Sequence, residues 1–223
     1  MPTPRYRNAL RALLTPAEHR IFARLNTPQK LQVYLEKLPP NFELKGETYM
    51  SPRRVLKAGT AHCAEAAVLA AAVLIYHGKP AWLVDIRALP SDQDHIITLF
   101  KERGLWGAIS KTNHAVLRWR DPIYRSPREL VMTYAHEYNL DFGKKSMQAY
   151  SRPFPMTRHA PARWVIADCD LDWLMDELDA YPHEPVAPKH ALDRRRRSTR
   201  VELKSQDVTE HPVPASRRVA KTK

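Results

Sequence analysis

Cysteine is scarce in this sequence of 223 residues, and no apolar run is long. The only two cysteines, Cys63 and Cys169, argue against a secreted fold held together by disulfides. The longest apolar run, Ala66 to Tyr76, is too short to cross a bilayer. The basic residues near the N-terminus are followed by no apolar stretch of the length that a signal peptide requires. We therefore expect a soluble protein of a reducing compartment, the cytoplasm, with no membrane partner.

Acidic residues are outnumbered by basic ones, above all toward the C-terminus. The net charge is +12, and residues 184–223 carry +6 of it, from 11 basic and 5 acidic residues. That segment is poor in apolar residues, is interrupted by prolines and contains the run Arg194-Arg195-Arg196-Arg197. Such a composition buries too little apolar surface to offset the entropy of ordering, so we expect a mostly disordered basic tail. Weak, salt-sensitive binding of an anionic partner such as a nucleic acid is a secondary expectation for this tail.

Four of the Ser-Pro and Thr-Pro pairs in the sequence mark expected helix starts. Serine or threonine at the N-cap accepts a hydrogen bond from a free amide, and proline at the first helical position needs no amide partner. The pairs are Thr15-Pro16, Thr27-Pro28, Ser51-Pro52 and Ser126-Pro127, and Glu18 and Glu129 complete capping boxes in the first and last. Two apolar helical faces follow later in the chain, formed by Leu130, Tyr134 and Tyr138, and by Leu171, Leu174, Met175 and Leu178 behind the N-cap candidate Asp170.

The middle of the chain predicts a buried helix followed by strands. Cys63 to Tyr76 is apolar nearly all round, as expected of a central helix, and His77-Gly78 supplies its end. Strands are expected at Ala81–Arg87, His95–Phe100 and Leu105–Ile109, with a fourth candidate at Ala115–Arg120. The residues Lys101-Glu102-Arg103-Gly104 predict a hairpin with a four-residue turn. This order of elements indicates an α+β fold.

Cys63 is the candidate nucleophile of this sequence. A thiol at a helix N-terminus lies at the positive end of the helix dipole, which favours the reactive thiolate. The alternative is that Cys63 is a small apolar core residue, since a cysteine without a placed base is weak support for catalysis. Cys169 has acidic neighbours that disfavour a thiolate, so a structural role is expected there.

His95 is the candidate base, at the start of the second strand. If Phe100 pairs with Leu105 across the turn, the antiparallel register places Ser110 opposite His95. A polar group there is what an orienting partner of a catalytic histidine requires. The alternative is that His95 merely caps the end of a strand.

The residues around Cys63 and His95 resemble the bacterial transglutaminase-like superfamily. The matching stretches are His62-Cys63-Ala64-Glu65-Ala66-Ala67, Gly78-Lys79-Pro80-Ala81-Trp82-Leu83-Val84, Asp94-His95 and Trp106-Gly107-Ala108-Ile109-Ser110, within about residues 46–125. The resemblance implies a papain-like core, in which a central cysteine-bearing helix packs on an antiparallel sheet with flanking helices. It also implies thiol chemistry on amides, because the family includes protein cross-linkers, cysteine proteases and deglycosylating amidases.

One position departs from the family pattern. The family usually carries an aspartate about four residues after the return-strand tryptophan, and Ser110 stands there. A serine hydroxyl accepts from the imidazole N–H but does not stabilise imidazolium as a carboxylate does. Four nearby residues are candidate substitutes for the missing acid: Asp92, Asp94, Asn113 and Asp121. The alternative is a weakened or retired site.

We therefore expect residues 1–183 to form one transglutaminase-like domain, with a helical part at 1–58 and the core at 59–183. Its candidate catalytic residues are Cys63, His95 and Ser110, and Tyr49 and Asn113 are candidate oxyanion or pocket residues. No cofactor or metal is expected, because the His and Cys residues lack the spacing of a zinc site. The expected function is hydrolysis or acyl transfer on a protein or peptide substrate. The alternative is an inactive member that binds peptides or proteins.

Overall fold

A computed structural model describes residues 1–44 and 46–214 of the chain. The helices are α1 (Pro4–Ala12), α2 (Pro16–Arg24), α3 (Pro28–Lys37), α4 (Pro52–Ala58), α5 (Cys63–Tyr76), α6 (Pro127–Met132), α7 (Ala162–Val165), α8 (Asp172–Asp179), α9 (Lys189–Asp193) and α10 (Arg200–Asp207), with a 3-10 turn η1 at Met156–Arg158. The strands are β1 (Trp82–Arg87), β2 (His95–Glu102), β3 (Leu105–Ile109), β4 (Arg120–Tyr124), β5 (Ala149–Ser151), β6 (Phe154–Pro155) and β7 (His183–Pro185). The protein therefore has the expected α+β composition.

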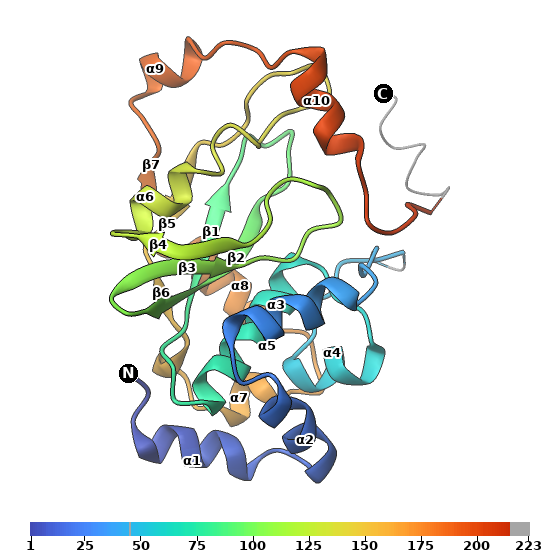
Figure 1. Cartoon of the computed structure of the whole chain (residues 1–223), viewed down its shortest axis with the longest axis vertical. Coiled ribbons are helices and arrows are strands. Elements are labelled where there is room, and N and C mark those ends of the chain that lie inside the picture. Colours follow the sequence, from blue (N-terminus) through green and yellow to red (C-terminus); the bar gives the residue numbers. More distant parts are fainter. Residues whose placement is uncertain (45, 215–223) are drawn as a thin grey trace.

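The strands form one sheet in the order β4-β3-β2-β1-β5-β7, and β6 also pairs with β1. Every pairing is antiparallel. Helices α1 to α5, α7 and α8 lie on one side of the sheet, and α6, α9 and α10 on the other (Figure 1). The cysteine-bearing helix α5 crosses the sheet against β2, where the Thr98 hydroxyl donates to the Ala67 carbonyl at 2.7 Å.

Two hydrophobic cores cover the two faces of the sheet, because successive strand residues point to opposite sides. Leu83 and Phe100 belong to the core that contains α5, whereas Val84 and Leu99 belong to the core beneath α6. Nearly every residue of α5 is buried, as its apolar composition predicts. Among the described residues no single helix is long and apolar enough to cross a membrane. Helices α4 and α5 have that length and composition only when taken together, and a bend of 114° separates them.

The four helix starts expected from the Ser-Pro and Thr-Pro pairs are confirmed. In each case the hydroxyl of the N-cap residue accepts from the backbone amide three residues on. The capping box of Thr15 and Glu18 is complete, whereas the Glu129 carboxylate accepts instead from the Arg125 amide. The central helix α5 has the expected bounds and ends before Gly78, which adopts a positive φ of 75°.

The hairpin of β2 and β3 forms, but its expected register is wrong by two residues. Glu102 pairs with Leu105, and Phe100 pairs with Gly107. The turn contains only Arg103 and Gly104, with φ values of 48° and 86°, and two left-handed residues favour this tight turn over a four-residue loop.

Three other local predictions also need correction. The fourth strand is β4, not Ala115–Arg120, because residues 111–119 form a loop in which Leu117 has a φ of 59°. Helix α6 ends at Met132, although Tyr134 and Tyr138 remain buried in the turns that follow. Asp170 does not cap α8, because its carboxylate accepts from the Tyr49 amide and Arg54.

The C-terminal segment differs from the disordered tail expected over residues 184–223. Within residues 184–214 the structure contains β7, α9 and α10, and the remaining residues of the expected tail lie outside the described part. Three of the four consecutive arginines make contacts. Arg195 donates to the Met147 carbonyl, Arg196 pairs with Glu202, and Arg197 lies over the Phe142 ring.

Candidate active site

The Cys63 thiol lies at the N-terminus of α5, where the sequence predicts it. Cys63 is the first residue of the helix and is partly exposed. The imidazoles of His62 and His95 lie close to its sulfur and act on its pKa. Burial raises the pKa of the Cys63 thiol, but the hydrogen bonds and positive charge of the two histidines outweigh burial and hold the pKa well below its ordinary value. The arrangement therefore favours a thiolate.

His95 is buried at the start of β2 and hydrogen-bonds Ser110. Its Nε2 atom lies 2.7 Å from the Ser110 hydroxyl oxygen, one residue beyond the end of β3. The structure thus brings together the three residues predicted as catalytic: Cys63 contacts His95, and His95 contacts Ser110.

The single proton of the Ser110 hydroxyl determines the tautomer of His95. That hydroxyl donates to the Leu117 carbonyl oxygen at 2.5 Å, so it can only accept from His95. Nε2 of His95 must then carry a proton, which leaves Nδ1 of the neutral ring free to take a proton from the Cys63 thiol. The Ser110 backbone is itself fixed, because the Gln32 side-chain amide on α3 exchanges two hydrogen bonds with it.

Gln32 is a site residue that the sequence analysis did not identify. It is 4% exposed and lies next to the apolar face of α3 that carries Leu31 and Leu35. A polar residue on the buried side of an amphipathic helix needs a partner, and this was the available signal.

His62 is the second imidazole at the thiol and was also missed. It is the N-cap residue of α5, with Nδ1 at 3.2 Å from the Ala64 amide nitrogen and Nε2 at 2.6 Å from the Thr48 carbonyl oxygen. Burial lowers the pKa of His62, but the adjacent Cys63 sulfur and the Glu65 carboxylate raise it to about 9. His62 therefore places positive charge beside the sulfur. Its position before the cysteine, at an expected helix start, was the signal for this role.

Glu65 ties the loop before α4 to the N-terminus of α5. This carboxylate is 1% exposed and accepts from four donors: Asn41 Nδ2, Thr48 Oγ1 and the amides of Met50 and His62. A buried carboxylate with its lone pairs occupied in this way is a rigid structural anchor. It holds the segment containing Tyr49 against the cysteine.

Tyr49 lies beside the site, as predicted. Its ring packs edge-on against the His62 ring at 5.8 Å between centroids. Burial and the nearby charges of Glu47, Glu43 and Cys63 raise the pKa of the Tyr49 hydroxyl to about 12, so the hydroxyl stays protonated and is able to donate.

Asn113, predicted to line the pocket, pairs with the C-terminal segment. Its side-chain amide exchanges hydrogen bonds with the backbone of His211, at 3.0 and 2.9 Å. It therefore fastens the C-terminal segment to the loop that follows Ser110.

The three acids proposed as substitutes for the missing aspartate have other partners. Asp92 accepts from the Ser146 hydroxyl, Asp94 from the Ala88 amide, and Asp121 from the Trp119 indole. Within the described residues, Ser110 is the group that contacts Nε2 of His95.

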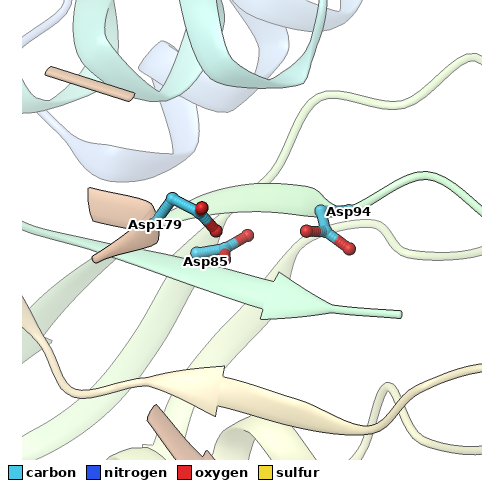
Figure 2. Close-up of side chains that lie close together, drawn as sticks. All are labelled: Asp85, Asp94 and Asp179. Carbon is cyan, nitrogen blue, oxygen red and sulfur yellow. The ribbon is translucent and has the colours of Figure 1, made fainter. Parts of the chain in front are cut away.

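A separate acidic cluster lies where strand β1, the loop before β2 and the end of helix α8 meet (Figure 2). Oxygens of Asp85, Asp94 and Asp179 lie within 4.8 Å of one another. Burial and the charges of Asp85 and Asp179 raise the pKa of Asp94, the Ala88 amide opposing them. Arg87 contacts both Asp85 and Asp179, and His183 lies 2.9 Å from Asp85. The Arg87 guanidinium and the His183 imidazole thus already occupy this cluster as partners.

Comparison with protein-family models and with curated proteins finds no match to this chain. A low-pKa thiol with an oriented imidazole is able to attack a carbonyl carbon and to protonate the group that leaves.

Proposed function

We propose that the protein is a thiol-dependent enzyme that cleaves or transfers acyl groups at amide or related bonds, with Cys63 as nucleophile and His95 as general base and acid. The observation that carries this proposal is the chain of contacts from Cys63 to His95 and from His95 to Ser110. A helix-borne cysteine packed on an antiparallel sheet, with histidine at a strand start, also supports the resemblance to transglutaminase-like proteins.

In the proposed reaction the Cys63 thiolate attacks the carbonyl carbon of a protein or peptide amide. A carbon–sulfur bond forms as the carbonyl π electrons move to oxygen. Collapse of this oxyanion breaks the carbon–nitrogen bond, and the imidazolium of His95 gives its proton to the leaving amine. Water, or an acceptor amine, then attacks the thioester while His95 removes its proton, and that proton returns to the sulfur as the acyl product leaves.

The N-terminus of α5 supplies a donor for the oxyanion. Ala64 donates to His62 Nδ1 and Ala66 to the His62 carbonyl, whereas the Cys63 amide has no partner within the described residues. A free amide at the positive end of a helix is suited to hold negative charge. The protonated Tyr49 hydroxyl is the proposed second donor.

The alkylation rate of Cys63 as a function of pH tests this proposal. The measurement uses iodoacetamide and a Cys169→Ser background, because Cys169 is the exposed second thiol. We expect a midpoint well below the free-thiol value of about 8.5, and a rise of that midpoint toward the free value in His95→Ala. A midpoint near the free value that is unchanged by His95→Ala would refute the proposed mechanism. Peptide amide hydrolysis and amine incorporation, each abolished in Cys63→Ser, then identify the reaction.

A second candidate function is supported by the neutral partner of His95. Ser110 does not stabilise imidazolium as a carboxylate does, which favours an inactive protein that binds peptides or proteins. Binding of a peptide library to Cys63→Ser, together with an unreactive thiol in the wild type, would support this alternative.

A further inference from the structure

A partly buried chain of hydrogen bonds continues from Ser110 away from the thiol. The Ser110 hydroxyl donates to the Leu117 carbonyl, and the Leu117 amide donates to Oε2 of Glu137 at 2.6 Å. Both polar groups of Leu117 are thus used, one toward the site and one toward a carboxylate. Glu137 follows α6 in sequence, 27 positions from Ser110.

Leu117 adopts a backbone conformation that leucine avoids. Its φ of 59° is in the left-handed region, where the Cβ atom of a residue other than glycine crowds the backbone. Such a conformation persists only where the surroundings enforce it. Here the charge-assisted hydrogen bond from the Leu117 amide to Glu137 is the contact that holds the turn, and the turn aims the carbonyl at Ser110.

Glu137 is itself held in place. Its Oε1 accepts from Arg120 Nη2 at 2.5 Å, and its backbone carbonyl accepts from Gln206 on α10. Arg120 in turn donates to the Thr133 hydroxyl and stacks over the Tyr134 ring at 4.0 Å. Glu137 is therefore held at its carboxylate by Arg120 and at its backbone by Gln206.

We propose that Glu137 is a positioning residue of the Cys63–His95 pair, acting through the Leu117 backbone and Ser110. The inference rests on the proposed function. As long as the Leu117 carbonyl takes the Ser110 proton, Ser110 must accept from His95, and Nδ1 of His95 stays free for Cys63. If the carbonyl turns away, the Ser110 hydroxyl is free to donate to Nε2 of His95 instead. The ring proton then moves to Nδ1, and that tautomer takes no proton from the thiol.

The test compares Glu137→Gln with Glu102→Gln. Glu102, at the end of β2, is a matched control because its carboxylate also pairs with a basic side chain, Lys79, and is equally exposed. Both are made in the Cys169→Ser background, and the alkylation rate of Cys63 is measured from pH 5 to 10. Glu137→Gln is expected to slow alkylation about 10-fold at pH values below the parent midpoint and to approach the parent rate at high pH, which corresponds to a rise of about one unit in the pKa of the thiol. Glu102→Gln is expected to leave the profile unchanged.

A rescue variant separates positioning from general destabilisation. Leu117→Gly retains the amide and carbonyl and adopts a positive φ without steric cost. We expect Glu137→Gln with Leu117→Gly to recover most of the rate lost in Glu137→Gln. The ring ¹⁵N shifts of His95, measured at pH 9 in a Cys63→Ser background, are expected to report a proton on Nε2 in the parent and in the double variant, and mixed tautomers in Glu137→Gln.

The outcomes of the two proposals are distinguishable. An ordinary thiol midpoint in the parent protein, insensitive to His95→Ala, contradicts the proposed function. A lowered parent midpoint that Glu137→Gln leaves in place contradicts the role of Glu137 alone, as does an unchanged His95 tautomer. If Glu137→Gln fails to fold and Leu117→Gly does not restore folding, Glu137 is a structural residue and the inference is wrong.

Discussion

His95 Nε2 and Ser110 Oγ lie 2.7 Å apart although the two residues are not cross-strand partners. The observed pairs of β2 and β3, such as Thr98 with Ile109, would place Thr112 opposite His95 if the ladder continued. The contact is therefore diagonal. A register shift of two residues keeps every side chain on its own face of the sheet, so a wrong register still predicted the right pair.

The hydroxyl of Ser110 is expected to orient His95 without a carboxylate charge. Ser110→Ala removes the acceptor of the His95 N–H and leaves the Leu117 carbonyl unpaired, so alkylation of Cys63 near pH 6.5 should slow roughly 10-fold. Ser110→Thr, which retains the hydroxyl, should react at close to the parent rate.

Replacing Ser110 with aspartate should not improve the site. The Leu117 carbonyl oxygen lies 2.5 Å from the Ser110 oxygen, so a carboxylate there would face another acceptor in a buried position. We expect Ser110→Asp to lower the melting temperature and to leave the thiol no more reactive than in the parent. Faster alkylation in Ser110→Asp than in the wild type would contradict this account of the departure.

His62 should contribute to thiol reactivity separately from His95. His62→Asn preserves an N-cap acceptor for α5 but removes the imidazole beside the sulfur. The pKa of Cys63 should rise, and the rise should add to that of His95→Ala, because each imidazole contacts the sulfur directly. The alkylation profiles of the two single variants and the double variant measure this; a double variant identical to His95→Ala would assign the whole effect to His95.

The local signals in the sequence were sufficient for the helix starts, for α5 and for the three strands that carry the site. Ser-Pro and Thr-Pro pairs act on neighbouring amides, so their effect does not depend on the rest of the fold. The pair of Cys63 and His95 was predictable because a helix start and a strand start are local features.

The parts that sequence did not predict depend on distant partners. Asp170 has the right position for a cap but is taken by Tyr49 and Arg54. Gln32 and Glu137 reach the site across 78 and 20 positions respectively, and no spacing rule connects such residues. The C-terminal segment follows the same logic, because its backbone pairs with the loop at Asn113 and its few apolar residues, Val186 and Leu192, pack on the distant core beneath α6.

The buried carboxylate of Glu65 should be a major source of stability around the cysteine. Glu65→Gln replaces one acceptor oxygen by an NH₂ group, which then faces the N–H and O–H donors that surround Glu65. This should lower the free energy of unfolding by ~3 kcal/mol. The matched control is Glu129→Gln, because Glu129 occupies the same third position of a helix but is exposed and accepts one backbone amide. Urea unfolding should give a loss of less than ~1 kcal/mol for this control. Equal losses in the two variants would contradict the anchoring role of Glu65.

The buried lysine after Ser110 should make stability rise with pH in the alkaline range. Lys111 is 3% exposed and donates to the Leu38 carbonyl at 2.5 Å, and burial, partly opposed by Glu210 and Glu36, lowers its pKa to about 8. Between that value and the unfolded value of about 10.4 the unfolded chain binds more protons than the folded one, so the burden of burying the ammonium is full below pH 8 and is relieved as pH rises.

The comparison of wild type with Lys111→Met isolates this contribution, because the other titrating groups are shared. The free energy of unfolding of the wild type, relative to Lys111→Met, should increase by ~3 kcal/mol between pH 7.5 and 10.5. Lys37→Met, which removes an exposed lysine at the end of helix α3, should show no such trend. Urea unfolding at several pH values measures both differences. A relative stability that is flat or falls with pH would mean that the Lys111 ammonium remains charged in the folded protein, held there by Glu210 and Glu36 in spite of its burial.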